Sequence, residues 1–182
     1  MLGAEGVCKN IPVTWTSPVP DPVDGPMTGD ERRILEGYLA WQRTTLLNVC
    51  AGLTLEQLVA RALPPSPLSL VGLVRHLAKV ERIWFRQRVA GQDVPSLYGG
   101  PGNSADFLEI DPAGAEGEVE QLRQEWKLAD EAVASIPFTH EIDVRGDAMS
   151  LRMIYLHVIG EYARHNGHAD LLREAIDRVT GR

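Results

Sequence analysis

The sequence predicts an all-α protein built as a four-helix bundle with long connections and an extended N-terminal arm. Three observations predict it. Four long segments carry apolar residues at alternating steps of three and four, the spacing of a helix that buries one face. The connections between them are rich in Gly and Pro, and 182 residues suffice for one well-filled core but are cramped for two. Four such faces can close around one shared core.

The arm and a first long helix open the chain. Residues 1–28 contain TSPVPDPVDGP, whose prolines favour an extended segment, and residues 29–182 are assigned to the bundle. Asp30 can cap a first helix that runs to about Cys50. The stripe of this helix is apolar apart from one glutamine and comprises Leu35, Leu39, Gln42, Leu46, Val49 and Leu53.

A short helix and a second long helix come next. Thr54 and Gln57 have the spacing of a capping box, which predicts a short helix ending near Arg61. Ser69 then opens a long helix through the segment SLVGLVRHLAKVERIWFRQRV. Its broad apolar face, suited to two neighbours in a bundle, comprises Leu70, Leu73, Val74, Leu77, Val80, Ile83 and Trp84.

The connection over residues 92–114 is rich in Gly and Pro and has no periodicity. A connection of this length inside a compact domain is either a functional lid or a mobile insert. If it is a lid, Tyr98 and Phe107 are the side chains that we expect to contact the covered pocket.

The third and fourth long helices complete the bundle. Residues 116–136 show the cleanest helical periodicity of the chain. The segment HEIDV, which begins at His140, predicts a short strand or an extended crossover. Ser150 then caps a helix that reaches about Arg178.

Composition excludes several classes of function. The net charge is −7 and Lys and Arg form no cluster, which argues against nucleic acid as a partner. The sequence has no run of the roughly 18 apolar residues that a membrane helix needs. The first residues lack the basic start and the apolar run of a signal peptide, so the cytoplasm is the expected location. Cys8 and Cys50 are too few for a disulfide framework and are expected to stay reduced.

The fourth long helix carries the residues that point to chemistry. Its core spacing runs through Leu151, Ile154, Val158, Glu161, His165, His168 and Leu172. A carboxylate and two imidazoles therefore occupy three consecutive positions of an otherwise apolar stripe, and a buried Glu is costly unless it is paired, protonated or bound to a metal. Glu161 and His165 stand one turn apart, and His76 interrupts the stripe of the second long helix in the same way. Together they would supply the three nitrogen and oxygen ligands of an open zinc site, which Ni could also occupy.

Other interpretations of these residues stay open. A histidine on an apolar face is more often a hydrogen-bonded core residue than a ligand, and Glu161 with His165 could be an ion pair on a partly exposed edge. His157, one turn before Glu161, could replace one ligand, whereas His140 is expected on the surface.

Aromatic and arginine side chains receive structural interpretations. We expect five aromatic residues to belong to the bundle core rather than to a binding box: Trp41, Trp84, Trp126, Tyr155 and Tyr162. Arg82 and Arg164 are interpreted as solvated arginines rather than as binders of an anionic group.

Two segments, LSLVGLVRHLAKVERIWF and SLRMIYLHVIGEYARHNGHADLLREAID, resemble the DinB-like superfamily, in particular its DUF664 branch. The resemblance covers the chain from about Gly29 onward. It implies a four-helix bundle whose metal site takes one His from the second helix and a His-x-x-x-His pair from the last. Glu161 stands where that motif has its first His, but the related mycothiol-dependent maleylpyruvate isomerase group also uses a His, Glu, His set. The resemblance places His168 beside the site, in contact with a ligand or a substrate, rather than among the ligands, although its position on the core stripe leaves it an alternative ligand.

The resemblance also implies a function. Several members of the superfamily are thiol S-transferases that use mycothiol or bacillithiol, so we expect a divalent metal, most simply zinc, together with a low-molecular-weight thiol and an electrophile as substrates. One alternative is a metal-dependent hydrolase that activates water in place of a thiol. Another is a metal-stabilised, non-catalytic binding protein of the stress response. A homodimer stays open as the state of assembly.

Overall fold

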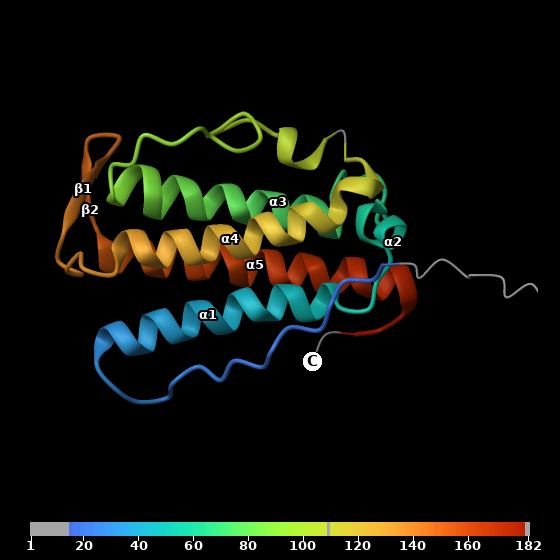
Figure 1. Ribbon diagram of the computed structural model, residues 1–182, viewed down its shortest axis with the longest axis horizontal. Helices are drawn as coiled ribbons and strands as arrows, with labels where there is room; N and C mark the ends of the chain where they lie inside the picture. Colours follow the sequence, from blue (N-terminus) through green and yellow to red (C-terminus); the bar gives the residue numbers. More distant parts are fainter. Residues whose placement is uncertain (1–14, 109, 181–182) are drawn as a thin grey trace, which may run out of the picture.

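A computed structural model describes residues 15–108 and 110–180 of the protein and confirms the all-α fold (Figure 1). The helices are α1 (Glu31–Cys50), α2 (Leu55–Val59), α3 (Leu70–Glu81), α4 (Ala115–Val133) and α5 (Leu151–Asp177). A π-helical segment, η1 (Arg82–Val89), continues α3, and η2 (Ala105–Phe107) and η3 (Pro112–Gly114) are single 3₁₀ turns. The strands β1 (Glu141–Val144) and β2 (Asp147–Ser150) form a hairpin.

The four long helices form two parallel pairs of opposite direction. Helices α1 and α5 run the same way, and α3 and α4 run the other way (Figure 1). Contacts along α1 and α5 confirm their common direction: Arg152 pairs with Glu31 near the two starts, and Arg173 donates to the carbonyls of Val49 and Ala51 near the two ends. This arrangement places α5 against both α1 and α3.

Side-chain caps begin the helices where the sequence predicts them. Asp30, Thr54, Ser69 and Ser150 each accept a hydrogen bond from the backbone N–H three residues later. These bonds satisfy N–H groups that have no partner inside the helix. The boundaries of α1 and α5 agree with the predicted ones within a residue or two, whereas α4 ends at Val133, before the expected Ile136.

The second long helix differs from a uniform α-helix. After Glu81 it continues as the π-helix η1, in which the Ala90 N–H donates to the Phe85 carbonyl five residues earlier. The buried apolar residues of this stretch are Val80, Ile83, Phe85 and Val89. Their spacing does not distinguish a π-helix from an α-helix, so the sequence alone does not predict the wider turn.

The predicted strand HEIDV is the first arm of a hairpin. Strands β1 and β2 pair antiparallel, with Val144 opposite Asp147. The two residues between them, Arg145 and Gly146, both have positive φ, as a two-residue hairpin turn of type I′ requires. His140, just before β1, is exposed, as expected.

The described part of the arm, residues 15–29, is extended and runs along the bundle (Figure 1). Ser17 exchanges backbone hydrogen bonds with Leu53 and Gly52, at 2.9 and 2.8 Å, which joins the arm to the end of α1. Cys8 lies outside the described residues. The boundary between arm and bundle after residue 28 stays a prediction.

Most of the predicted core aromatics lie in the core. Tyr155 and Tyr162 are fully buried, and Trp84 and Trp126 pack partly buried against the core. The prediction for Trp41 is wrong, because its side chain is 41% exposed. Trp41 precedes Gln42 by one residue, so its side chain is turned about 100° away from the buried stripe of α1. No helix within residues 15–108 and 110–180 has both the length and the apolar content to cross a bilayer.

Ion pairs built on buried arginines connect the helices; we call them the arginine network. Its members are Arg43 with Glu81 and Asp130, and Arg82 and Arg86 with Glu125. Arg43 donates two bonds of 2.8 Å to Glu81, whose side chain is completely buried. The prediction that Arg82 is a solvated arginine is therefore wrong. Each buried carboxylate of the network faces at least one guanidinium, as a tolerated buried charge requires.

Candidate metal centre

Three predicted residues converge between α3 and α5; we call His76, Glu161 and His165 the acceptor cluster. Each offers one nitrogen or oxygen, and these atoms all lie within 4.8 Å of one another. Glu161 Oε2 is 3.8 Å from His76 Nε2 and 3.5 Å from His165 Nε2. Ligands about 2.0–2.1 Å from a tetrahedral zinc ion stand roughly 3.3 Å apart. The observed spacing therefore needs only a small contraction to fit a metal ion.

In both histidines, Nδ1, the ring nitrogen that does not face Glu161, contacts a second polar group. His76 Nδ1 bonds to Asp106 Oδ2 at 2.8 Å, and His165 Nδ1 lies 3.3 Å from His168 Nδ1. Asp106 also pairs with Lys79 at 2.9 Å. Partners of this kind at the far ring nitrogen are typical of metal-binding histidines, because they turn the other nitrogen toward the ion.

The charge states make the cluster unfavourable without a cation. Burial alone would raise the pKa of Asp106, but hydrogen bonds from His76 and Lys79 bring its pKa below the ordinary value, so Asp106 accepts the proton bonded to His76 Nδ1. Burial, with the neighbouring His76, lowers the pKa of His165 to about 4, which leaves this imidazole neutral at pH 7. We assign its proton to Nδ1, facing His168. The Nε2 lone pair of His165 then faces the Glu161 carboxylate oxygen, acceptor against acceptor.

Of the two side chains predicted to contact the pocket from the loop, one lies at the cluster and the other does not. The Phe107 ring stacks on His76 with centroids 5.3 Å apart, so the loop of residues 92–108 does contact the site. Tyr98 lies elsewhere, since its hydroxyl bonds to Glu118 and its ring packs against Arg75. Of the expected lid contacts, the structure places only Phe107 at the cluster.

Two further predicted residues border the cluster without joining it. His157 packs edge-on against Trp84, with centroids 4.5 Å apart, and does not replace a ligand. Arg164 Nη1 is 3.4 Å from Glu161 Oε1, the oxygen that does not face the imidazoles, and its side chain is 64% exposed. Arg164 is thus solvated, as expected, and yet contacts the central carboxylate.

Sequence reasoning missed Asp106 and Lys79. Lys79 stands three residues after His76, on the same side of α3, and this spacing was the one available signal. Asp106 belongs to a loop without periodicity, and only the folded chain shows that it is 1% exposed and bonded to His76.

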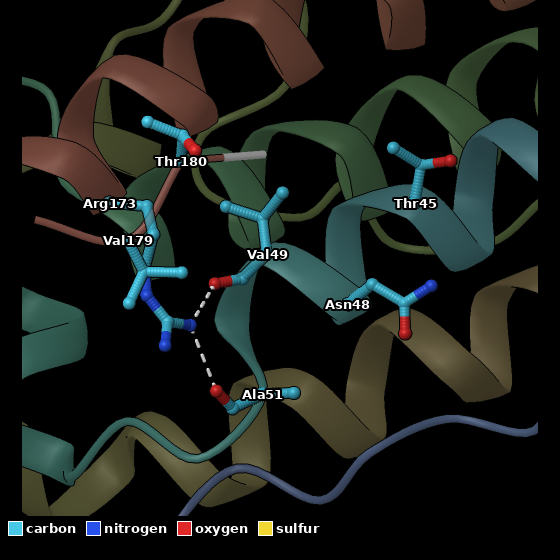
Figure 2. A pocket seen from close by; sticks show the side chains of 7 residues that line it. All are labelled: Thr45, Asn48, Val49, Ala51, Arg173, Val179 and Thr180. Carbon is cyan, nitrogen blue, oxygen red and sulfur yellow. Dashed lines mark hydrogen bonds between the residues drawn. The ribbon is translucent and has the colours of Figure 1, made fainter. Parts of the chain in front are cut away.

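A cavity of about 320 Å³ lies elsewhere, between the ends of α1 and α5 (Figure 2). Arg173, the only charged residue in its lining among residues 15–108 and 110–180, donates to the carbonyls of Val49 and Ala51, as Figure 2 shows, and to Asp177. Its nitrogens are therefore engaged in holding the end of α1. Cys50 stands between Val49 and Ala51 in the sequence and is buried, and burial raises the pKa of its thiol to about 12. Neither feature offers a reactive group.

The fold and this cluster define a class: an α-helical bundle with a His, Glu, His set of the kind that holds a divalent ion. The model of the mycothiol-S-transferase family matches residues 34–178, and the chain belongs to this family. This match confirms the resemblance to the DinB-like superfamily. Searches of curated proteins and of solved structures found no match.

Proposed function

We propose that the protein is a metal-dependent thiol S-transferase that joins mycothiol, or a similar low-molecular-weight thiol, to an electrophile. His76, Glu161 and His165 would hold the ion, and zinc suits two imidazoles and one carboxylate best. The observation that carries the proposal is the meeting of three acceptor atoms, with each imidazole held from behind. Membership of the mycothiol-S-transferase family supports the choice of reaction.

The chemistry of the donor set fits this role. A divalent ion in such a site supplies Lewis acidity, which lowers the pKa of a bound thiol so that the thiolate is present near neutral pH. Glu161 brings one negative charge and the imidazoles bring none, so the ligand set neutralises half the charge of a divalent ion. The remaining positive charge favours an anionic sulfur.

The described part of the chain supplies no reactive cysteine thiol of its own. Cys50 is buried and the pKa of its thiol lies near 12, so it is protonated and inaccessible at neutral pH. The attacking sulfur therefore belongs to the cosubstrate in our proposal. Phe107 borders the cluster with apolar surface, and the exposed Arg164 beside Glu161 is placed to hold an anionic group of a substrate.

The test combines metal analysis with a conjugation assay. Purified protein should carry about one divalent ion per chain, and a thiol plus a model electrophile should give conjugate only with the loaded protein. His165→Ala should lose both the ion and the activity, whereas the exposed His140→Ala should keep both. Full metal content in His165→Ala would refute the ligand assignment.

The same assay separates the alternatives. Hydrolysis of a model ester by the loaded protein without thiol would support the hydrolase. A loaded protein that is stabilised by the ion, yet neither binds mycothiol nor reacts, would support a structural role for the ion.

A further inference from the structure

We propose that Asp106 is a positioning residue for His76, and that it couples the docking of the loop of residues 92–108 to metal binding. The inference rests on the proposed metal site. It adds to that site Asp106, which lies on neither of the two helices that carry the ligands. It also implies that a bound ion stabilises the docked position of the loop of residues 92–108.

Asp106 reaches into the protein from η2, a single turn near the end of the loop. Its side chain is 1% exposed, and one oxygen, Oδ2, accepts from His76 Nδ1 at 2.8 Å and from Lys79 Nζ at 2.9 Å. Lys79 balances the charge of the buried carboxylate. Through this one oxygen, Asp106 therefore links the loop to His76 and to Lys79 of α3.

The loop backbone is fastened to α3 in the three residues just before Asp106. Lys79 Nζ donates to the Asn103 carbonyl at 2.7 Å, and Arg75 Nη2 donates to the Ala105 carbonyl at 3.1 Å. The Asn103 side chain in turn accepts from the Ala105 N–H at 2.8 Å. These bonds hold the carboxylate of Asp106 at the height of His76 on the helix.

Gly72 makes room for the docked loop. A Cβ at this position would lie 3.0 Å from Cδ1 of Phe107, a distance at which one of the two groups must move. Because Gly72 has no side chain, the Phe107 ring packs against α3 and stacks on His76. Apolar contact and the Asp106 bond therefore fix the same loop at adjacent points.

The consequence for the metal follows from the two nitrogens of a neutral imidazole. An anionic acceptor at Nδ1 holds the proton there, so the lone pair of Nε2 points toward Glu161 and an ion. Loss of such a partner weakens metal binding by about 10- to 100-fold in metal sites generally. Coupling is reciprocal, so an ion bound to His76 must also stabilise the docked loop.

The central experiment uses Asp106→Asn, which keeps the shape of the side chain and removes its charge. Affinity for Co²⁺ is measured by competition with a chelator, together with the visible spectrum of the bound ion. We expect affinity about 10- to 100-fold below that of the wild type and a changed Co²⁺ spectrum. Hydrogen exchange should show faster exchange of the amides of residues 103–108, and addition of Co²⁺ to the wild type should slow it.

Glu125→Gln is the matched control. Glu125 is also a fully buried carboxylate with cationic partners, Arg82 and Arg86, but it contacts no member of the acceptor cluster. This variant should lose stability and keep the affinity and spectrum of the wild type. Asp106→Asn with wild-type affinity and spectrum would overturn this inference alone, whereas a wild type that takes up no Co²⁺ would overturn the proposed function as well.

Gly72→Ala keeps the inference testable if Asp106→Asn does not fold. The added methyl group would lie 3.0 Å from the Phe107 ring and 3.2 Å from Ser69 Oγ, so it shifts Phe107 while it removes no polar group and touches neither Asp106 nor His76. We expect faster exchange in residues 103–108 and a several-fold loss of Co²⁺ affinity. A loosened loop with unchanged affinity would show that the loop and the ion are not coupled.

Discussion

Two polar groups of residues interrupt the apolar core, and they differ in what faces the carboxylates. In the arginine network, Glu81 and Glu125 each receive hydrogen bonds from guanidinium groups. In the acceptor cluster, Glu161 Oε2 faces two imidazole nitrogens at 3.8 and 3.5 Å, and the nitrogen of His165 is assigned as a lone-pair acceptor. The first arrangement is complete as it stands, whereas under our proposal a cation completes the second.

The comparison teaches which observation marks a functional site. Glu81 and Glu125 of the network are more buried than Glu161, so burial of an acid by itself does not identify a metal ligand. An acceptor that faces another acceptor is the observation on which the proposed metal site rests, because two acceptors gain nothing from each other without a cation between them. Perturbed groups at functional sites are stability costs that a ligand offsets.

The largest effect should come from breaking the arginine network. Arg43→Met leaves Glu81 buried without its bidentate partner. We expect the free energy of unfolding, measured by urea denaturation in chelator, to fall by about 3–5 kcal/mol. The metal affinity of the folded variant should match that of the wild type. A loss below about 1 kcal/mol would mean that the network adds little stability.

Metal addition should act only through the acceptor cluster. At a free Zn²⁺ concentration of about 100 times Kd, binding should raise the free energy of unfolding by about 2.7 kcal/mol. The same increment is expected in Arg43→Met, because the two sites share no residue, and none in His165→Ala. Equal stabilisation of His165→Ala would place the ion elsewhere.

In the absence of metal, removing the charge of the central carboxylate of the cluster should not lower the free energy of unfolding appreciably, whereas breaking the network should. Glu161→Gln replaces the central carboxylate by a neutral amide, which can donate to an imidazole nitrogen. In chelator we expect the free energy of unfolding to change by less than about 1 kcal/mol or to rise. A loss of several kcal/mol in urea denaturation would show that Glu161 is already paired without an ion.

The smallest effect concerns His157, at the edge of the cluster. Burial lowers its pKa below the ordinary 6.5; Glu161 opposes the shift, and Arg164 and Arg88 add to it. The unfolded chain therefore takes up this proton first, and the stability contributed by neutral His157 is lost as the pH falls below about 6.5. An NMR titration should give a midpoint below 6.5, and His157→Gln should remove this component of acid sensitivity.

Much of the fold could be predicted from short patterns. Asp30, Ser69 and Ser150 mark helix starts that the structure confirms, because a cap depends on residues three positions apart. The departures have nonlocal causes. Trp41 lies outside the core because of how α1 is rotated, and the widening at η1 follows contacts with α4 that periodicity in one segment does not contain.

For the candidate site, the sequence by itself determined the three residues that interrupt apolar stripes, His76, Glu161 and His165. It could do so because a polar group at a core position is visible from helical spacing alone. Only the tertiary structure decided that their nitrogen and oxygen atoms meet, that Asp106 contacts His76, and that Arg82 forms an ion pair with Glu125 instead of facing solvent. The physical reason is the same in each case. Spacing along one helix specifies the direction in which a side chain points, whereas the residue that it meets there belongs to a segment 30 or more residues away, which the packing of the whole bundle brings into contact.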